Sequence, residues 1–339
     1  MRKVVLFFAA VVSAFAMADA EPNDSARVSY VPNFHGTVRA RFEYATDNGE
    51  YRFQVRNARF TINGNICREV SYFVNTDLCD RGKMKILDAW AKAEFIPHLS
   101  LQAGQFRMPF GVDPFRAPHQ YYFANRSFIG KQMCNYRAVG AMLIYDFSSF
   151  PLKLEAGAFN PYTIGDHTVW EKKLAAAGKA TLGVGEFKLS AGGSTIRPSG
   201  VRANLAGCCV SWSHGRWIVE GEYMYKHYVH GASKNAHAYS VFSNYYMPVK
   251  AGIFNRLSVQ GRFDGITDHS DCATDESGTL HITDAARNRI TAGATLTCMK
   301  AKNMYFDFRV DYEKNFYRHG FKPAPEYGDK LVAEIVLRF

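Results

Sequence analysis

Beyond its first residues, the 339-residue sequence has no long apolar run. No later segment reaches the roughly 18 consecutive apolar residues that a membrane-spanning helix needs. The P-loop, G-x-S-x-G and H-E-x-x-H motifs of several enzyme classes are also missing. What the sequence does have is 26 Phe and 19 Tyr, together with 21% charged residues. This composition suits a chain whose residues alternate between lipid and water.

Cysteine gives no recognisable framework either. The seven cysteines are spaced neither as a zinc site nor as a small disulfide scaffold, and their odd number leaves at least one outside any internal pair. Cys67 and Cys79 lie near opposite ends of one expected strand, which is too long for a direct bridge. A pair between Cys134 and Cys272, both in expected external loops, stays open. We expect no metal site and no cofactor.

The first 20 residues have the pattern of an export signal. Arg2 and Lys3 precede the apolar stretch VVLFFAAVVSAFAMA, and Ala18-Asp19-Ala20 is an A-x-A-type cleavage site. We therefore expect a signal peptide over residues 1–20 and a mature domain over 21–339, with an uncleaved anchor as the alternative. Removing the signal's net charge of +1 from the total of +10 leaves a mature charge of +9. A basic exported protein can attract several kinds of anion, so charge alone does not choose a partner.

Strict alternation of apolar and polar residues predicts strands throughout the mature chain. The last segment, DKLVAEIVLRF at 329–339, places Leu331, Ile335 and Phe339 on one face. Segment 51–63 changes phase, which a β-bulge near Asn57 would explain. Period-two alternation over eight to ten residues suits a tilted membrane-spanning strand. About sixteen segments show it, near 37–45, 51–63, 67–77, 85–95, 99–106, 137–147, 152–160, 172–182, 186–194, 203–213, 216–227, 236–246, 254–264, 288–298, 303–313 and 329–339.

The connections between these segments alternate between short and long. Short ones include the Gly-Asn pair at 64–65 and the turn at 183–185, whereas 107–136 and 265–287 are long. This layout predicts an all-β fold, a transmembrane antiparallel barrel of about 16 strands, with both termini on the short-turn, periplasmic side. A soluble β-sandwich is the alternative. The final strand must pair with the first so that no edge stays open in lipid. A C-terminal aromatic resembles the assembly signal of outer-membrane barrels, and Phe339 is the expected signal here.

A barrel of sixteen strands leaves a water-filled lumen. Its inward positions are polar. Acids such as Glu43, Glu220, Asp264 and Asp311 interleave with the cations, so the strands alone do not identify the barrel as an anion channel. The inward cations of the expected strands include Arg39, Arg41, Arg262 and Arg309.

The connection at 107–137 carries the clearest charge bias. It has one acid, Asp113, and three stiffening prolines. Its cations are Arg107, Arg116, Arg126, Lys131 and Arg137. Long loops inside compact domains are usually functional, so we expect this third loop to fold into the lumen and narrow the pore. Arginine can hold an oxyanion through two parallel N–H bonds. The alternative is an external, solvated loop.

The same region resembles a known family. The motifs are DAWAKAEFIPHLSLQAGQFRMPFGVDPF at 88–115, NRSF at 125–128, RAVGAMLIY at 137–145 and RNARFTINGNI at 56–66. They resemble the phosphate-selective porin O and P family. This resemblance implies a sixteen-stranded, usually trimeric outer-membrane porin whose third loop lies in the lumen and whose arginines and lysines select anions. The anion-selecting role that the resemblance implies carries over to Arg56, Arg59 and Arg107, which lie inside the matched motifs.

The sequence therefore predicts a porin of the bacterial outer membrane, not an enzyme, for passive diffusion of small anions, with phosphate as the candidate solute. Expected partners are outer-membrane lipid and lipopolysaccharide, the barrel assembly machinery and two further copies in a homotrimer, and no nucleic acid. A general, non-selective diffusion porin is the alternative, followed by a loop-borne adhesin or receptor and a rim-active enzyme. His227, His230 and His237 are expected on a solvated rim rather than around a metal. The acidic segment 268–279 lacks EF-hand spacing and is expected to be a solvated tip.

Overall fold

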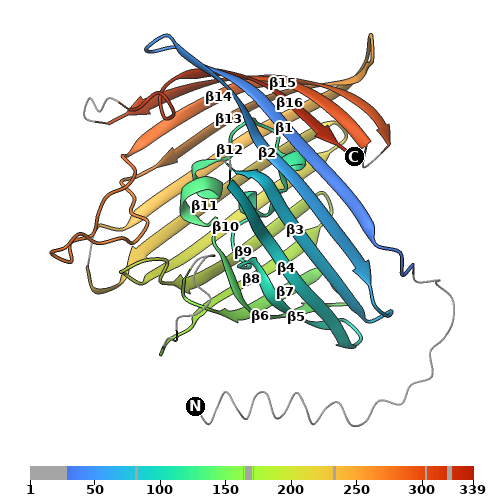
Figure 1. Ribbon diagram of the computed structural model, residues 1–339, viewed down its shortest axis with the longest axis vertical. Coiled ribbons are helices and arrows are strands. Elements are labelled where there is room, and N and C mark those ends of the chain that lie inside the picture. Colours follow the sequence, from blue (N-terminus) through green and yellow to red (C-terminus); the bar gives the residue numbers. More distant parts are fainter. Residues whose placement is uncertain are drawn as a thin grey trace.

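The computed structural model describes residues 29–80, 83–162, 164, 170, 172–231, 234–301, 304–318 and 323–339. Within these residues, sixteen antiparallel strands form a closed barrel in which each strand pairs with its sequence neighbours and β1 pairs with β16 (Figure 1). The predicted signal peptide, residues 1–20, lies outside the described residues. In the described part, no helix has the length and apolar character to cross a membrane.

The predicted all-β barrel is confirmed, and each expected segment corresponds to one strand. The strands are β1 (Asn33–Ala45), β2 (Glu50–Asn65), β3 (Val70–Asp80), β4 (Lys83–Ile96), β5 (Leu99–Arg107), β6 (Arg137–Asp146), β7 (Leu152–Phe159), β8 (Ala175–Val184), β9 (Phe187–Ile196), β10 (Ala203–His214), β11 (Trp217–Tyr228), β12 (Ala236–Ala251), β13 (Phe254–Ile266), β14 (Arg287–Ala301), β15 (Met304–Tyr317) and β16 (Lys330–Arg338).

Two local predictions in β2 have different outcomes. The bulge near Asn57 is confirmed, because Asn57 pairs with Arg39 whereas Val55 pairs with Ala40, which leaves Arg56 as the extra residue. The turn at 64–65 is wrong, since Gly64 still pairs with Tyr72. A side chain at Gly64 would collide with the Tyr72 hydroxyl, 2.6 Å from an ideal Cβ. This glycine therefore makes room for a cross-strand ring rather than for a turn.

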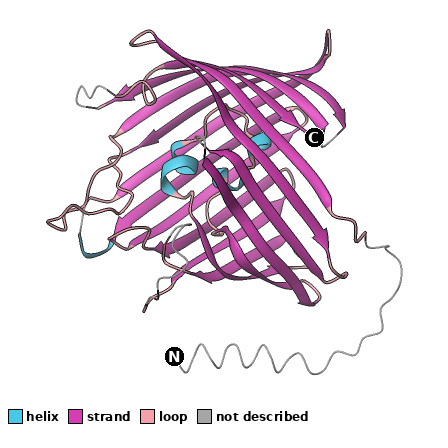
Figure 2. Cartoon of the chain, viewed as in Figure 1, coloured by secondary structure: helices cyan, strands magenta, loops and turns pink. Residues whose placement is uncertain are grey.

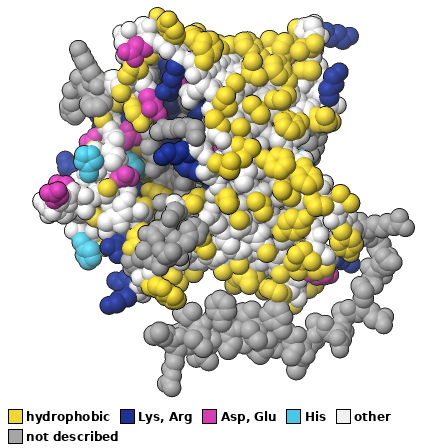
Figure 3. Space-filling view, viewed as in Figure 1, with side chains coloured by type: hydrophobic (Ala, Val, Ile, Leu, Met, Phe, Trp, Pro, Cys, Tyr) yellow, Lys and Arg dark blue, Asp and Glu magenta, His cyan; other side chains and the backbone are white. Residues whose placement is uncertain are grey.

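The alternation that predicts the strands is visible in their burial. In β16, Val332, Glu334 and Val336 are buried while Leu331 and Ile335 are exposed on the outer surface. Figure 3 shows hydrophobic side chains covering much of the outer wall of the barrel. An apolar exterior with charged side chains on the opposite face of the same strands is typical of a barrel in lipid.

The last residue closes the barrel against the first strand. The backbone N–H of Gly36 donates to the Phe339 carbonyl at 2.7 Å, and the Phe339 N–H donates back to Gly36 at 3.2 Å. The Phe339 ring lies over Gly36, where an ideal Cβ would be 2.2 Å from the ring. The sheet thus has no open edge at this seam. That Phe339 also acts as an assembly signal stays a prediction.

The third loop, residues 108–136, connects β5 to β6. It contains the short helical turns η2 (Asp113–Phe115), η3 (Pro118–Gln120) and η4 (Ile129–Met133), which Figure 2 shows in cyan behind the strands of the near wall. Arg107 and Arg137, expected at the ends of this loop, instead form the last pair of the β5–β6 ladder. Arg107 and Arg137 therefore belong to the barrel wall, and the third loop begins and ends next to them.

Candidate functional site

The charged side chains inside the barrel are mostly paired with one another. Arg39 on β1 lies 2.6 Å from Glu334 on β16, and both are buried. Arg59 pairs with Asp77 at 3.1 Å, and Arg137 pairs with Asp88 at 2.8 Å. A buried ion needs a partner of opposite charge or several hydrogen bonds to remain charged. The interleaved acids of the sequence thus neutralise much of the arginine charge on the wall.

Four wall arginines also hold the backbone of the third loop. They donate to its carbonyl oxygens at 2.6–2.9 Å: Arg309 to Tyr121, Arg39 to Ala124, Arg262 to Asn125 and Arg289 to Arg126. The strands that carry these arginines are β1, β13, β14 and β15, which lie with β16 on one side of the barrel. A guanidinium that is bonded to a carboxylate and to a backbone carbonyl has few donors left for a passing solute.

Wall carboxylates accept from the backbone N–H groups of the same loop. Glu222 on β11 accepts from Val112 at 2.6 Å and from Asp113 at 3.1 Å. Asp311 accepts from Ala124 at 2.6 Å, and Asp264 accepts from Phe128 at 3.0 Å; these acids stand on β15 and β13. Because these bonds run to three different strands, the loop has little freedom to shift as a body.

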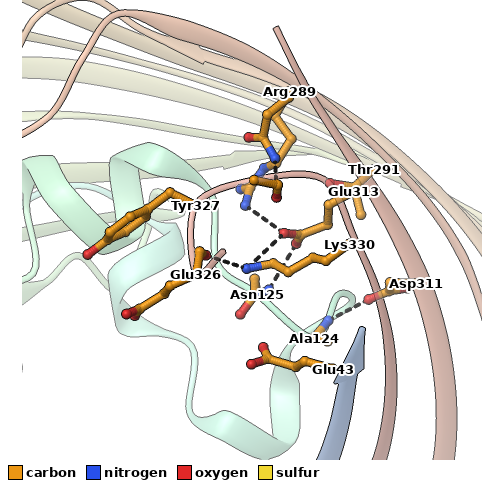
Figure 4. A network of polar contacts seen from close by, with 12 residues as sticks. Glu43, Ala124, Asn125, Arg289, Thr291, Asp311, Glu313, Glu326, Tyr327 and Lys330 are labelled. Atoms are coloured by element: carbon orange, nitrogen blue, oxygen red, sulfur yellow. Dashed lines mark hydrogen bonds and ion pairs between the residues drawn. The ribbon is translucent and has the colours of Figure 1, made fainter. Parts of the chain in front are cut away.

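Asn125 links the loop to a charged network at the wall. Its side-chain amide donates to Glu313 at 3.1 Å, and its side-chain oxygen accepts from Arg41 at 2.9 Å. Glu313 also lies 3.4 Å from Arg289 and 3.8 Å from Lys330 (Figure 4). Arg41 is further paired with Glu43 at 3.2 Å. The side-chain amide of Asn125 therefore connects the Arg41–Glu43 ion pair to the ion pairs of Glu313.

The other side of the loop packs into an apolar core inside the barrel. Small residues on β6, β8, β10 and β12 leave room for large loop side chains, which differs from the expected all-polar inner wall. The buried cluster includes Met108, Phe110, Phe128, Ile129, Met133, Ala138, Ala175, Ala177, Ala203, Ala236 and Ala238. Water is excluded from such a core. Open space is therefore left mainly beside the charged wall.

Two cavities lie along this charged wall. We name them by the connections at their end of the barrel: the long-loop cavity has a volume of about 360 Å³, and the short-turn cavity about 670 Å³. Tyr121 of the third loop lines both. A space of only about 20 Å³ beside Tyr121, Tyr122 and Arg126 lies between loop and wall. The segment around Tyr121 thus separates the two cavities.

The long-loop cavity holds most of the predicted site residues. Among the described residues that line it are twelve Lys and Arg side chains and four carboxylates. The predicted residues there are Arg39, Arg41, Arg56, Arg59, Arg107, Arg126, Lys131 and Arg137. The structure does not place Arg116, Arg262 and Arg309 with them. Arg116 and Arg309 line the short-turn cavity, and Arg262 lies under the loop. Arg116 is paired with Glu220 and Asp113.

Three cations of the long-loop cavity make no ion pair in the described part of the chain: Arg107, Arg126 and Lys131. Arg107 is buried, and its Nε has no hydrogen-bond partner. Arg126 donates to neutral groups, the Arg116 carbonyl at 2.9 Å and the Asn135 side chain at 3.2 Å. Lys131 stands over the Tyr327 ring, 4.9 Å from its centre. These three cations are the ones whose charge is available to an anion.

Arg287, Arg289 and Lys330 line the same cavity but were not predicted as site residues. Arg287 and Arg289 share a face with the buried Thr291 on β14, so strand phase could have found them. Arg287 was missed because the expected strand began one residue too late. Lys330 begins β16, where the cavity wall is completed by the closing strand.

The histidine and acidic loop segments show no metal-binding cluster. No group of three or more His, Cys, Asp or Glu side chains suited to a metal ion occurs within the described ranges. His227 contacts Asn235 at 2.8 Å, and His237 contacts the Tyr223 hydroxyl at 2.7 Å. Asp275 accepts from Ser277 and from the Thr279 backbone within its own tight turn. All seven cysteines are free, including the buried Cys134 and Cys272.

Comparisons with solved structures find the same fold. The barrel is similar to an anion-selective porin from Comamonas acidovorans, with a TM-score of 0.61 at 10% identity, covering 91% of this chain and 99% of that one. It is equally similar to the trimer form of OmpT from Vibrio cholerae (TM-score 0.61, 12% identity, 91% and 99% covered). OmpF from Salmonella typhi gives a TM-score of 0.61 at 14% identity, covering 91% and 97%.

A search of curated proteins finds no match. The sequence model of the family described as phosphate-selective porin O and P matches residues 28–179. This range contains β1 to β7, the third loop and the motifs on which the resemblance rests. The matched family model and the porin fold together indicate a channel of the bacterial outer membrane. The resemblance to this family is thus confirmed over residues 28–179, and the barrel as a whole has the porin fold.

Proposed function

We propose that this barrel is a porin through which small anions diffuse passively, with phosphate or a similar oxyanion as the preferred solute, and that it is not an enzyme. The observation that carries the proposal is the group formed by Arg107, Arg126 and Lys131. These three cations line one cavity and make no ion pair with a carboxylate among the described residues. Uncompensated fixed charge in a narrow, low-dielectric passage raises the local concentration of counter-ions.

The chemistry of the three groups suits an oxyanion. Arg107 and Arg126 can each offer parallel N–H donors to two oxygens, and Lys131 adds a point charge. They lie with the paired cations Arg59 and Arg137 along the same cavity. An anion can therefore exchange one set of donors for the next, and several weak sites in series allow both entry and release.

The third loop forms the constriction in this proposal. Its carbonyl and N–H groups are held by wall side chains, and Tyr121 stands between the two cavities. A rigid constriction keeps Arg126 and Lys131 at fixed positions in the passage. The remaining partners follow from the family: a homotrimer in the outer membrane, surrounded by lipid and lipopolysaccharide, exported by residues 1–20 and assembled through Phe339. The OmpT structure from Vibrio cholerae is described as a trimer form.

The test is the reversal potential of single channels in a salt gradient. We expect a preference for anions in the wild-type protein. The combined variant Arg107→Ala, Arg126→Ala and Lys131→Ala should lose most of it, because three unpaired positive charges leave the cavity. Lys250→Ala with Lys300→Ala is the matched control, since both lysines are exposed and line none of the cavities described above.

The alternative is a general, non-selective porin. It has an observation in its favour, because most wall arginines are paired with carboxylates. A reversal potential near zero in the wild type would support it. An anion preference that survives in the triple variant would show that the unpaired cations are not the selective element.

A further inference from the structure

We propose that the anion filter is one-sided: selectivity resides in the long-loop cavity, and the open pore therefore rectifies ionic current. This inference rests on the proposed function, because it assumes that the pore conducts anions. It adds that the anion current depends on the direction in which the anions cross the pore. Anions should carry more current when they move from the long-loop end to the short-turn end than in the opposite direction.

The first support is the difference in charge between the two cavities. Counted over described residues, the long-loop cavity has twelve Lys and Arg side chains and four carboxylates around about 360 Å³. The short-turn cavity has four Lys and Arg side chains and two carboxylates around about 670 Å³. The density of fixed positive charge is therefore several times higher in the smaller cavity.

The second support is where the cavities lie along the barrel. Arg52, Arg287 and Lys330 line the long-loop cavity and stand near strand ends on the side of the barrel where the long connections lie. Lys188 and Arg256 line the short-turn cavity and stand beside the turns at 185–186 and 252–253. The two charge densities therefore occupy opposite ends of the passage.

The third support is the fixed boundary between the cavities. Tyr121 lines both, its carbonyl accepts from Arg309 at 2.6 Å, and the Arg39 guanidinium lies 4.9 Å from its ring centre. Ala124 is held at both its N–H and its carbonyl, by Asp311 and Arg39. A boundary held in this way keeps the charged and the nearly neutral compartments distinct while ions pass.

Rectification follows from ion transport across such a junction. In the positively charged compartment anions carry nearly all the current, whereas in the nearly neutral one anions and cations share it. Anions that move out of the charged compartment raise the salt concentration beyond the junction, and anions that move into it lower that concentration. The current is therefore larger when the short-turn side is held positive. Low salt strengthens the effect, because the Debye length is about 10 Å at 0.1 M and about 3 Å at 1 M.

The experiment records current against voltage from single channels in equal salt on both sides, first at 0.1 M and then at 1 M. A biotin-acceptor peptide inserted after Ser277, in the exposed tip of a long connection, reports orientation through streptavidin added to one side. We expect a ratio of currents above one, larger with the short-turn side positive, that falls toward one at 1 M salt. Arg107→Ala with Arg126→Ala and Lys131→Ala should bring the ratio closer to one at 0.1 M salt, because the long-loop cavity loses three of its twelve cations.

A matched variant removes charge from the other compartment. Lys188→Ala with Arg256→Ala should keep or increase the ratio, because the short-turn cavity becomes less positive. A linear current in a channel that still prefers anions would overturn the one-sided filter and leave the proposed function intact. A ratio of currents in the triple variant equal to that of the wild type would also overturn it. A channel with no anion preference would remove both the inference and the proposed function.

Discussion

At the scale of residues, the arginines of this barrel divide into two groups that sequence type does not distinguish. Arg39 and Arg309 are each bonded to Glu334 and to a loop carbonyl, so their role is structural. Arg107 and Arg126 line the long-loop cavity and have no carboxylate partner in the described chain. We interpret the first group as supports of the third loop and the second as the anion site.

Lys131 makes the anion site sensitive to pH. The pKa of Lys131 is lowered to about 8. The main cause is burial away from water, and the positive charges of Lys330, Arg289 and Arg287 act in the same direction, whereas the negative charge of Glu326 acts against them. A lysine is charged below its pKa, so this positive charge is present at pH 7 and is lost as the pH rises past 8. We expect the anion preference to fall between pH 7 and pH 9 in reversal-potential measurements.

The matched variant for this prediction is Lys131→Arg. Arginine stays protonated over this pH range, so the variant should keep its anion preference at pH 9. Lys131→Ala should show the lower preference at both pH values. If Lys131→Arg and the wild type changed equally with pH, the titrating group would lie elsewhere.

The pairing of residues is what sequence could not predict. Strand phase correctly placed Arg39, Arg262 and Arg309 inside the barrel. It could not show that Arg39 meets Glu334, which lies 295 positions away in the chain. Partners on strands so far apart in sequence are set by barrel closure and register, and neither can be read from a local pattern. For this reason the predicted site contained cations that are already neutralised.

At the scale of elements, the third loop is held mainly through its backbone. Glu222 accepts from the N–H groups of Val112 and Asp113, at the start of η2. Close by, Gly111 adopts a positive φ of 73°, and an ideal Cβ there would be 2.8 Å from the Cys134 sulfur. A loop with these supports should resist proteases although it contains Arg and Lys. The sequence predicted the length and charge of this loop, but not the acidic residue that holds it.

Removing the Glu222 side chain should loosen the loop. Glu222→Ala leaves two N–H groups without their acceptor, each at a cost of about 1–3 kcal/mol. We expect faster tryptic cleavage at Arg116, Arg126 and Lys131, and greater noise in the open-channel current. Glu222→Gln keeps a side-chain oxygen acceptor and should be cleaved at a rate between those of the alanine variant and the wild type. Equal cleavage of all three proteins would contradict the role given to Glu222.

At the scale of the whole molecule, barrel closure depends on the contact between Gly36 and Phe339. A methyl group at position 36 would overlap the Phe339 ring, since an ideal Cβ lies 2.2 Å from it. Overpacking of this kind typically costs about 1–3 kcal/mol. We expect Gly36→Ala to reduce the yield of folded barrel on refolding into detergent, measured by the gel shift between heated and unheated samples.

The double variant Gly36→Ala with Phe339→Ala separates this contact from other effects. It removes the overlapping ring, so refolding should recover relative to Gly36→Ala alone. Equal yields for the single and the double variant would mean that the ring contact does not limit closure. Because refolding in detergent needs no cellular machinery, the result is independent of any role of Phe339 as an assembly signal.

The architecture as a whole could be predicted from the sequence, and the inside of the barrel only in part. Period-two alternation and the alternation of short and long connections gave the strand number and the order around the barrel, because both are local properties of the chain. The apolar core between the third loop and the alanines of β6, β8, β10 and β12 was not predicted. Alanines on a strand do not by themselves indicate which side chains pack into the space beside them.

The most direct test of the account is single-channel conductance in chloride while phosphate is titrated in, for the wild type and for the Arg107→Ala, Arg126→Ala, Lys131→Ala variant. We expect phosphate to reduce the wild-type chloride current to a plateau, because phosphate occupies the long-loop cavity. We expect this block to be lost in the variant. A wild-type current that stays proportional to voltage and unchanged by phosphate would contradict the anion site and leave a general diffusion porin.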